Sequence, residues 1–536
     1  MSEPKAQVNR SPELTEAWIL GTGTASFASA LHLVFEAKLP PSKVHILDSH
    51  ISMGQAVYHN GDPVNGYDQF AACLPVPSGE PIKQLFDLVP SVRGQGKSLW
   101  EEIQSAEAKH VSTKHGNDTR FLVQKDGYLK DIATTKLGMS TRHRLRLVSL
   151  MFKGEKRLGR NQIRDFLPNS FFQSPFWAIW SAQFGFQPWH SAAEFKRAVR
   201  EYLREFHTLS IITCLDITGY YQFESIFLPL YVYLQSLGVD FHFDTTVTDI
   251  LTSGENNNKA VSQLNLIQNG FPVQQKIGQH DIVIISIGST ISGATRGTNN
   301  SPPDGQSIEP NDKLDENWSL WLEIGTKSHA FGNPYNFCTR QAESTLQSFT
   351  ITTADLTLFD HLQSISHSNQ AGAFITLPES PWRLNLCIPW QPVFDQQPSD
   401  IRVLWGSALE PRRKGKFVKK PMTDCSGMEV TIELLGHLNY PSLVHHTITI
   451  PRVMPRMSAG LLARSSNDRP GVIPQETCNL GLIGPFVEIP RYSCVDVSYG
   501  VRTAQLAVSQ LMGLHRQRDE SKKPLIFDIL RVLFWD

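Results

Sequence analysis

The chain has 536 residues and a formal net charge of −1 at pH 7, and 40% of its residues are hydrophobic. A single hydrophobic core stops growing well below this length, so two or three subdomains are expected. The near-zero charge excludes an overall field that would attract nucleic acid or an anionic membrane, so a partner must be sought at local sites.

The cysteines and the first residues indicate a cellular compartment. Seven cysteines are scattered along the chain without a C-x-x-C pair, which argues against a disulfide framework and favours reduced thiols. The polar segment 1–16 lacks the apolar region of a secretion signal, and no run of 18 apolar residues occurs. These features predict a cytoplasmic protein.

A strand, a glycine turn, a helix and a second strand are expected over residues 17–48. The turn reads Gly21-x-Gly23-x-x-Ser26, and the second strand ends at Asp48. In such a unit Gly21 permits the tight turn, Gly23 lets a pyrophosphate approach the helix amino terminus, and the acid accepts from a ribose hydroxyl. Ser26 replaces the third glycine of the motif. A glycine-rich turn that binds no ligand is the alternative.

Later segments are expected to return to the same sheet. Residues 239–247 resume strand-like alternation, and residues 281–286 form a buried strand that suits a parallel sheet. Residues 479–484 form a last strand, and 501–514 form a helix. Because flavin domains are discontinuous in this way, FAD is preferred over NAD, although Asp48 alone does not separate the two.

The predicted fold class is α/β, with a discontinuous Rossmann-like FAD-binding domain, a substrate-binding domain and a mostly helical part. The FAD-binding domain is expected to combine residues 1–135, 205–300 and 470–515. The remaining parts are an aromatic-rich helical segment at 136–204, a substrate-binding domain at 316–469 and a C-terminal amphipathic helix at 516–536.

Several ordered segments resemble those of a known family. They are residues 171–177, 189–192, 220–225, 244–247, 331–334, 419–423, 468–470 and 501–504. On these segments the chain resembles the oleate hydratase family, also called myosin-cross-reactive antigens, over nearly its whole length. The resemblance implies a homodimeric flavoprotein that uses FAD without net redox and adds water to an isolated double bond of a free fatty acid.

The resemblance assigns the proton donor of this reaction to Tyr220. A phenol with an ordinary pKa of ~10 stays protonated at neutral pH and can donate. Taken alone, Tyr220 fits a core tyrosine with a satisfied hydroxyl better than a catalytic acid.

The loop that carries the family's water-orienting glutamate departs from the pattern. Leu74 stands in place of that glutamate, Cys73 replaces an arginine, and both flavin-facing glycines have become alanine. Trp390 replaces another arginine, and Asp496-Val497-Ser498 stands where the family has Thr-Thr-Glu, before the retained Tyr499. Several departures around one cavity favour a changed reaction.

Three functions stay open. An alkene protonated without an activated water can lose another proton or be trapped internally, giving isomerisation or cyclisation in specialised, secondary metabolism. A true hydratase would need another carboxylate, such as Asp68 or Glu80, although both are interpreted as surface acids because charged side chains are seldom buried unpaired. A non-catalytic protein that binds FAD or lipid is the third function, and flavin redox chemistry is disfavoured by the resemblance.

The candidate site residues fall into two groups. The residues expected to contact the cofactor are Gly21, Gly23, Thr24, Ala25, Ser26, Asp48, Gly54, Gln55, Val247, Ser289, Gly484, Ser498 and Val501. The residues expected to line the pocket for an apolar unsaturated substrate are Phe70, Cys73, Leu74, Gln222 and Trp390. The eighteen histidines show no H-E-x-x-H or other metal spacing, so no catalytic metal is predicted.

Two apolar features have two interpretations each. Leu525, Ile529 and Leu533 lie at helical spacing behind two lysines, which fits a peripheral membrane helix or a helix docked on the protein's own core or on a dimer mate. An aromatic cluster fits a substrate tunnel or ordinary core. Its members are Trp177, Trp180, Phe184 and Phe186.

Overall fold

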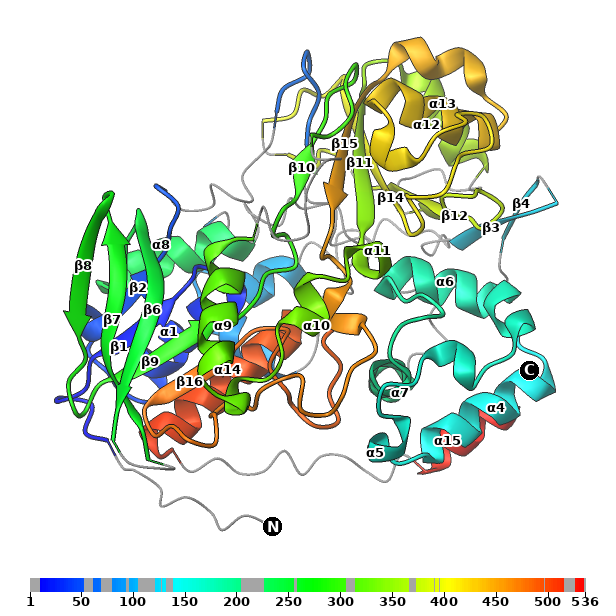
Figure 1. Ribbon diagram of the computed structural model, residues 1–536. Helices are drawn as coiled ribbons and strands as arrows, with labels where there is room; N and C mark the ends of the chain where they lie inside the picture. Colours follow the sequence, from blue (N-terminus) through cyan, green and yellow to red (C-terminus); the bar gives the residue numbers. More distant parts are fainter. Residues whose placement is uncertain are drawn as a thin grey trace.

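Short, mostly apolar segments form a five-stranded parallel sheet, seen at the left of Figure 1. The structure is a computed structural model and describes residues 10–52, 61–68, 80–92, 96–104, 121–126, 128–131, 138–203, 226–254, 258–304, 314–365, 373–389, 391–394, 396–495, 497–514 and 526–534. Every pairing between neighbouring strands of this sheet is parallel. In spatial order the strands are β16 (Leu480–Ile483), β9 (Ile282–Ser286), β1 (Ala17–Leu20), β2 (Val44–Leu47) and β5 (Asp240–His242).

Helices cover one face of this sheet and bury its apolar side chains. Helix α1 (Thr24–Phe35) packs against α14 (Val497–Met512) and α8 (Leu228–Leu237). Phe27 of α1 meets Phe241 of β5 with ring centroids 6.4 Å apart, so this side chain of the edge strand faces α1.

An antiparallel three-stranded sheet follows β5 in the chain and lies beside β2. Helix α9 (Glu316–Lys327) packs on its first strand and buries Trp318 and Trp321 in the same core as the parallel sheet. Helix α2 (Glu80–Asp87) packs on α14. The strands of the small sheet are β6 (Thr245–Ser253), β7 (Ala260–Gln268) and β8 (Phe271–Lys276).

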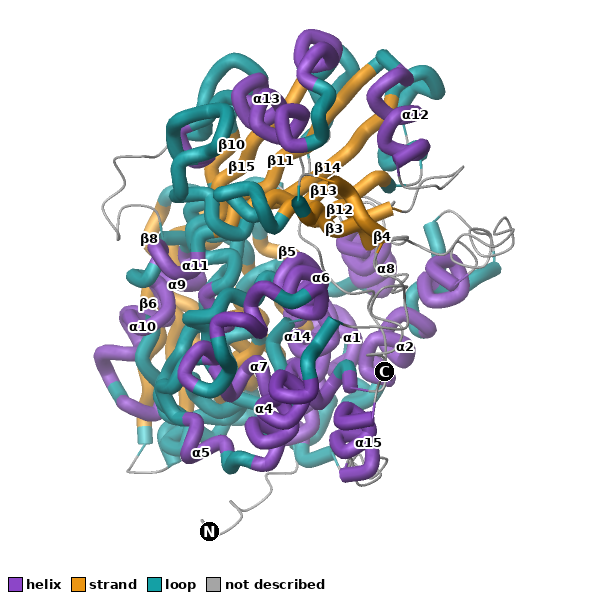
Figure 2. The backbone as a smooth tube through the Cα atoms, turned by 90° about the vertical axis from the view of Figure 1, so that its right-hand side faces the viewer, coloured by secondary structure: helices purple, strands orange, loops and turns teal. Residues whose placement is uncertain are grey.

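A second, eight-stranded sheet forms the upper part of the molecule (Figure 2). The single-turn helices α10 (Tyr335–Cys338) and α11 (Gln341–Ser344) lead into it, and α12 (Leu356–Ile365) and α13 (Gly427–His437) pack on it. In spatial order its strands are β10 (Thr295–Arg296), β15 (Ile448–Met454), β11 (Leu346–Thr353), β14 (Arg402–Ala408), β13 (Leu384–Ile388), β12 (Ala373–Leu377), β3 (Phe121–Lys125) and β4 (Tyr128–Asp131).

The helical unit has an aromatic core of its own. Serine side chains cap the amino termini of its longer helices at Ser140, Ser174 and Ser191, so each helix begins where the sequence places a capping residue. Its helices are α4 (Thr141–Phe152), α5 (Glu155–Leu158), α6 (Pro175–Phe184), α7 (Ala192–Glu201) and the distant α15 (Ile526–Arg531).

The C-terminal helix α15 docks on the protein's own core. Ile529 is buried against α4, and Leu533 packs against the same cluster, whereas Ile526 and Phe527 are 46% and 74% exposed. The docked-helix alternative therefore holds for these residues, and the membrane contact stays a prediction for the exposed side chains. Within the described residues, no helix is long and apolar enough to span a bilayer.

The domain boundaries differ from the predicted ones. Strands β3 and β4, expected in the FAD-binding segment 1–135, extend the second sheet because β3 pairs with β12. Strand β10, expected in the FAD-binding segment 205–300, pairs with β15. Helix α9, expected within the substrate-binding segment 316–469, packs in the core of the parallel sheet. The sheet or core that each of these elements joins is decided by contacts with residues far away in the chain.

A buried carboxylate joins the helical unit to the rest of the molecule. Glu194 of α7 is inaccessible to solvent and lies 2.6 Å from Arg464, 3.2 Å from Arg197 and 3.3 Å from Arg469. It also accepts hydrogen bonds from the Ser493 hydroxyl and the Cys494 backbone amide. Burial alone would raise the pKa of Glu194, but the three guanidinium groups outweigh it and hold the pKa well below its ordinary range.

Removing this carboxylate should destabilise the fold strongly. In the variant Glu194→Ala, three buried arginines lose a shared counter-charge, and an uncompensated buried charge costs about 3–5 kcal/mol. The measurement is the free energy of unfolding in urea. The control is Glu323→Ala, because Glu323 is 49% exposed and pairs with Lys327 at 3.8 Å, a contact worth less than about 1 kcal/mol. Equal losses in the two variants would contradict a structural role for the buried cluster.

Candidate functional site

The glycine turn after β1 has the geometry that the motif predicts. Gly21 has φ +99°, and its amide donates to the Leu47 carbonyl at 2.8 Å. A side chain at Gly21 would be strained and would meet Asn317 at 3.3 Å. Gly23 precedes α1 with φ −90°, and a Cβ atom there would meet nothing within 4 Å. The first glycine is therefore needed by the fold, whereas the second leaves open space beside the helix.

The amino terminus of α1 is free of a side-chain cap. The first amides of a helix lack partners within the helix and carry the positive end of its dipole, so this terminus suits an anion. Ser26, the replacement for the third glycine, is buried, and among the described residues its hydroxyl oxygen has no hydrogen-bond partner. Uncapped amides beside open space fit the pyrophosphate of a dinucleotide.

Asp48 follows β2 and is held by its neighbours. The carboxylate is 5% exposed, accepts from the His50 amide at 2.8 Å and lies 2.6 Å from Nδ1 of the same residue. Thr22 of the glycine turn donates to its other oxygen. The hydrogen bond to Asp48 raises the pKa of His50. Since each carboxylate oxygen can accept two hydrogen bonds, Asp48 keeps capacity for a ribose hydroxyl.

A cavity of about 330 Å³ opens at the glycine turn, where the carboxyl ends of the parallel strands meet. Its described lining contains hydroxyl groups and one thiol but no carboxylate side chain. The wall on the side of the parallel sheet comprises Gly23, Thr24, Ala25, Ser286, Thr290, Gly484, Pro485, Val497, Tyr499 and Gly500. The opposite wall comprises Ala182, Phe184, Gly185, Leu346, Ser407, Leu409, Met454, Met457, Ser458, Gly460, Leu461, Cys494 and Val495.

The cavity thus lies where all three parts of the molecule meet. Helix α6 contributes Phe184, the second sheet contributes Leu346 and Met454, and the parallel sheet contributes Gly484 just after β16. Gly484 has φ +103° and donates its amide to Thr503 of α14 at 3.0 Å. An apolar substrate entering from the second domain would meet a nucleotide bound at the glycine turn.

The first turn of α14 is fixed from within by Tyr499. Its hydroxyl donates to the Val487 carbonyl at 2.6 Å and accepts from the Ile489 amide at 3.0 Å. Burial raises the pKa of Tyr499, so the phenol stays protonated. Ser498, a predicted cofactor contact, is buried between two residues that line the cavity.

Three other residues predicted to contact the cofactor make contacts within the protein. Ser289 adjoins the cavity-lining Thr290; its carbonyl accepts from Trp318 at 2.8 Å and its hydroxyl bonds the Asp315 carboxylate. Burial, aided by a neighbouring glutamate, raises the pKa of Asp315 to about 6. Val247 and Val501 are buried in the core of the parallel sheet and are not among the residues that line the cavity.

Several predicted site residues lie outside the described residues. They are Tyr220, Gln222, Gly54, Gln55, Phe70, Cys73, Leu74 and Trp390. Of the aromatic cluster, Phe184 lines the cavity, whereas Trp177, Trp180 and Phe186 pack in the core of the helical unit.

The interpretation of Asp68 as a surface acid is wrong. The side chain is 2% exposed and forms an ion pair with the buried Arg452 of β15. Burial raises the pKa of Asp68, although Arg452 and Arg296 oppose the shift. A carboxylate can be buried at this position because Arg452 of the second sheet supplies a compensating positive charge. Glu80, the other acid considered, is exposed at the start of α2.

Sequence patterns alone missed much of the cavity. Met454, Met457 and Leu346 belong to no sequence motif, and at the start of α14 only the family resemblance around Tyr499 indicates a site. Cys494, one of the seven scattered cysteines, lines the cavity and lies 3.2 Å from the Arg469 guanidinium. No local signal marks these residues, because separate sheets bring them together.

The parallel sheet, the glycine turn and the uncapped helix terminus define a Rossmann-like dinucleotide-binding fold, here joined to an apolar-walled second domain. The predicted α/β fold class is confirmed. The MCRA family profile matches residues 14–509, and the chain belongs to this family.

Two curated relatives are similar over most of their length. An oleate hydratase from Streptococcus pyogenes serotype M49 (strain NZ131) is 27% identical over 515 residues, which cover 93% of this chain and 85% of the relative. A linoleate hydratase from Lactiplantibacillus plantarum is 28% identical over 467 residues, which cover 81% of this chain and 80% of the relative. The resemblance inferred from the sequence motifs is confirmed.

A solved structure of putrescine oxidase, a double mutant redesigned in cofactor binding, is also similar. Its TM-score is 0.51 at 9% identity, covering 93% of this chain and 99% of that chain. A similarity at this identity concerns the fold alone.

Loss of the Tyr499 hydroxyl should loosen the cavity wall without changing its shape. The variant Tyr499→Phe leaves the buried Ile489 amide and Val487 carbonyl without this partner, which costs about 1–3 kcal/mol. Urea unfolding measures the loss, and Tyr335→Phe, at a 52% exposed tyrosine, is the control. A variant at position 499 as stable as the control would show that the hydroxyl does not fix α14.

Proposed function

We propose that this chain is an FAD-binding enzyme that acts without net redox on a carbon-carbon double bond of a long apolar substrate, by acid-initiated isomerisation or cyclisation. The observation that carries the proposal is the cavity, where a dinucleotide-type glycine turn meets walls of methionine, leucine and phenylalanine. Membership of the MCRA family and its hydratase relatives support an enzyme of this kind.

The described residues fit FAD. The open space beside Gly23 and the uncapped amides of α1 would hold the pyrophosphate, and Asp48 would accept from a ribose hydroxyl. The first turn of α14 lines the adjoining cavity through Val497, Tyr499 and Gly500. When bound, FAD supplies a flat polar ring and fixed electrostatics at the edge of the cavity.

Acid initiation rests on Tyr220, through the family resemblance. In this step the alkene electron pair takes the phenol proton, so a C–H bond forms, the O–H bond breaks and the neighbouring carbon becomes a cation. Return of a proton from an adjacent carbon to the phenolate moves the double bond. Alternatively, a second alkene attacks the cation and closes a ring, and the new cation formed by this attack then loses a proton to the phenolate. Both outcomes conserve electrons and need no water.

The loss of the family's glutamate supports this reaction over hydration. Leu74 replaces the family's glutamate, and no carboxylate occurs among the described residues that line the cavity. Asp68, the buried acid considered as a substitute for that glutamate, forms an ion pair with Arg452 instead. A dry, apolar wall would protect a cation from capture by water.

The second candidate is hydration of an unsaturated fatty acid. Both curated relatives carry hydratase names, and the chain covers 85% and 80% of their lengths. A protein that binds FAD or lipid without turnover is the third candidate, and the product assay below separates the three.

FAD binding should depend on the two glycines in different ways. The variant Gly23→Val fills open space, so flavin absorbance of the purified protein should fall at least about tenfold with little change in the thermal stability of the flavin-free protein. The variant Gly21→Ala forces φ +99° on alanine and should lower the stability of the flavin-free protein by about 1–2 kcal/mol. Undiminished flavin in Gly23→Val would place the cofactor elsewhere.

The reaction is tested by mass spectrometry of products. The purified, FAD-loaded protein is incubated with unsaturated free fatty acids and polyenes of several lengths, and Tyr220→Phe serves as the matched control. The expected product has the mass of its substrate and a moved double bond or a new ring, and the variant forms none. A mass increase of one water would establish the hydratase, and absence of any product would favour the binding protein.

A further inference from the structure

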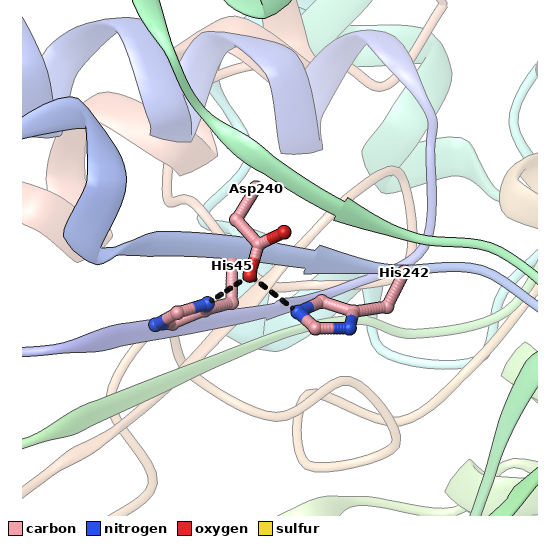
Figure 3. Close-up of side chains that lie close together, drawn as sticks. All are labelled: His45, Asp240 and His242. Atoms are coloured by element: carbon pink, nitrogen blue, oxygen red, sulfur yellow. Dashed lines mark hydrogen bonds and ion pairs between the residues drawn. The ribbon is translucent and has the colours of Figure 1, made fainter.

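A second cluster of polar side chains lies at the edge of the parallel sheet, away from the cavity lining (Figure 3). His45 lies on β2, and Asp240 and His242 lie on the edge strand β5. The strands pair in parallel with His45 opposite Asp240 and Leu47 opposite His242. Because side chains alternate along a strand, all three project from one face. Phe241 projects from the other face, toward Phe27 of α1.

The three side chains converge on one point. Nδ1 of His45 lies 2.9 Å, and Nε2 of His242 2.7 Å, from the same oxygen, Oδ2 of Asp240 (Figure 3). All three atoms lie within 4.8 Å of one another. Nε2 of His242 is hidden from solvent, and its contact lacks the geometry of a hydrogen bond. The His45 contact is a hydrogen bond, and the second imidazole nitrogen lies against the same carboxylate oxygen, so three potential metal ligands crowd together.

We propose that His45, Asp240 and His242 bind a divalent transition metal ion of the zinc type. Imidazole nitrogen and carboxylate oxygen are preferred zinc ligands, and three protein ligands leave a fourth, tetrahedral position for water. Ligand distances of about 2.0–2.1 Å place the donor atoms about 3.3 Å apart, so the carboxylate has to retreat by about 0.5 Å. Asp240 is 46% exposed, which gives it room to move and gives water access to the ion.

Neighbouring groups orient one ligand. The ring of Trp18 on β1 stacks on His45 with centroids 4.3 Å apart and planes 18° apart. Oε2 of Glu16 lies 3.9 Å from Nε2 of His45, on the side away from Asp240. This distance is too long for a hydrogen bond, but the negative charge would favour a proton on Nε2 once an ion takes the Nδ1 lone pair. Such outer partners are a regular part of histidine metal sites.

The role of this site would be structural. Strand β5 has three residues and, in the part of the chain that the structure describes, pairs with β2 alone at the edge of its sheet. An ion shared by β2 and β5 would bridge the two strands through their side chains. The resulting stabilisation depends on the metal concentration, because the ion binds the folded chain and not the separated strands.

The experiment measures zinc binding to the untagged full-length protein. Metal is removed with a chelator, the protein is dialysed against ZnCl₂, and bound zinc is counted by plasma mass spectrometry. The variants His242→Ala and Asp240→Asn are compared with His446→Ala. His446 lies 3.1 Å from Asp355 and is not part of any three-ligand group found among the described residues, so it is a matched histidine-aspartate pair. Circular dichroism of the metal-free variants verifies their folding.

The proposal expects His242→Ala and Asp240→Asn each to weaken one zinc equivalent at least about tenfold, while His446→Ala leaves binding unchanged. Zinc should raise the midpoint of thermal unfolding of the wild type and of His446→Ala, but not that of His242→Ala or Asp240→Asn. Cobalt should give visible absorption bands that His242→Ala abolishes. Equal binding by all variants, equal loss in His446→Ala, or no zinc bound by the wild type would each overturn the site.

Discussion

The buried carboxylate of Glu194 is the contact on which the arrangement of the three parts depends. It lies on α7 of the helical unit, but its partners come from two other segments: Arg464 and Arg469 after β15, and Ser493 and Cys494 before α14. Counting α7, which also carries Arg197, three backbone segments thus share one buried negative charge. Because Glu194 is inaccessible to solvent, its charge depends on these partners staying in place, and the geometry of the segments is coupled.

This coupling reaches the cavity directly. Cys494 binds Glu194 through its amide and lines the cavity through its side chain, and α14 begins three residues later. The start of α14 and the glycine turn then form one wall, while Met454 and Phe184 belong to the other. Among the described residues the charges lie outside the lining, which presents hydroxyls, a thiol, methionine sulfur and carbon. Such a surface suits an apolar substrate beside a nucleotide.

The edge of the parallel sheet shows a different use of charge. Strand β5 carries Asp240 and His242 on one face and Phe241 on the other. The apolar side chain attaches the strand to α1, and the polar pair meets His45 across the strand boundary. Charged and polar side chains on an edge strand oppose pairing with another chain, and a bound ion would hold this short strand further. One face of this three-residue strand thus packs in the core, and the other face carries its polar side chains.

The sequence by itself determined the nucleotide unit. The strand expected from residue 17, the turn at Gly21 and the strand ending at Asp48 became β1, the glycine turn and β2, because apolar runs, glycine and proline act locally. The expected strands at 281–286 and 479–484 became β9 and β16 for the same reason. The helix expected to begin at 501 begins at Val497, and family motifs supplied the membership that the profile confirms.

Only the tertiary structure decided what distant segments form together. β3 and β4 joined the second sheet, Asp68 was buried by a guanidinium from β15, and His45 met Asp240 and His242 across nearly two hundred residues of chain. The cavity likewise combines residues from three separate units. Such contacts depend on strand pairing and on the packing of whole elements, and a linear pattern of residue types carries neither.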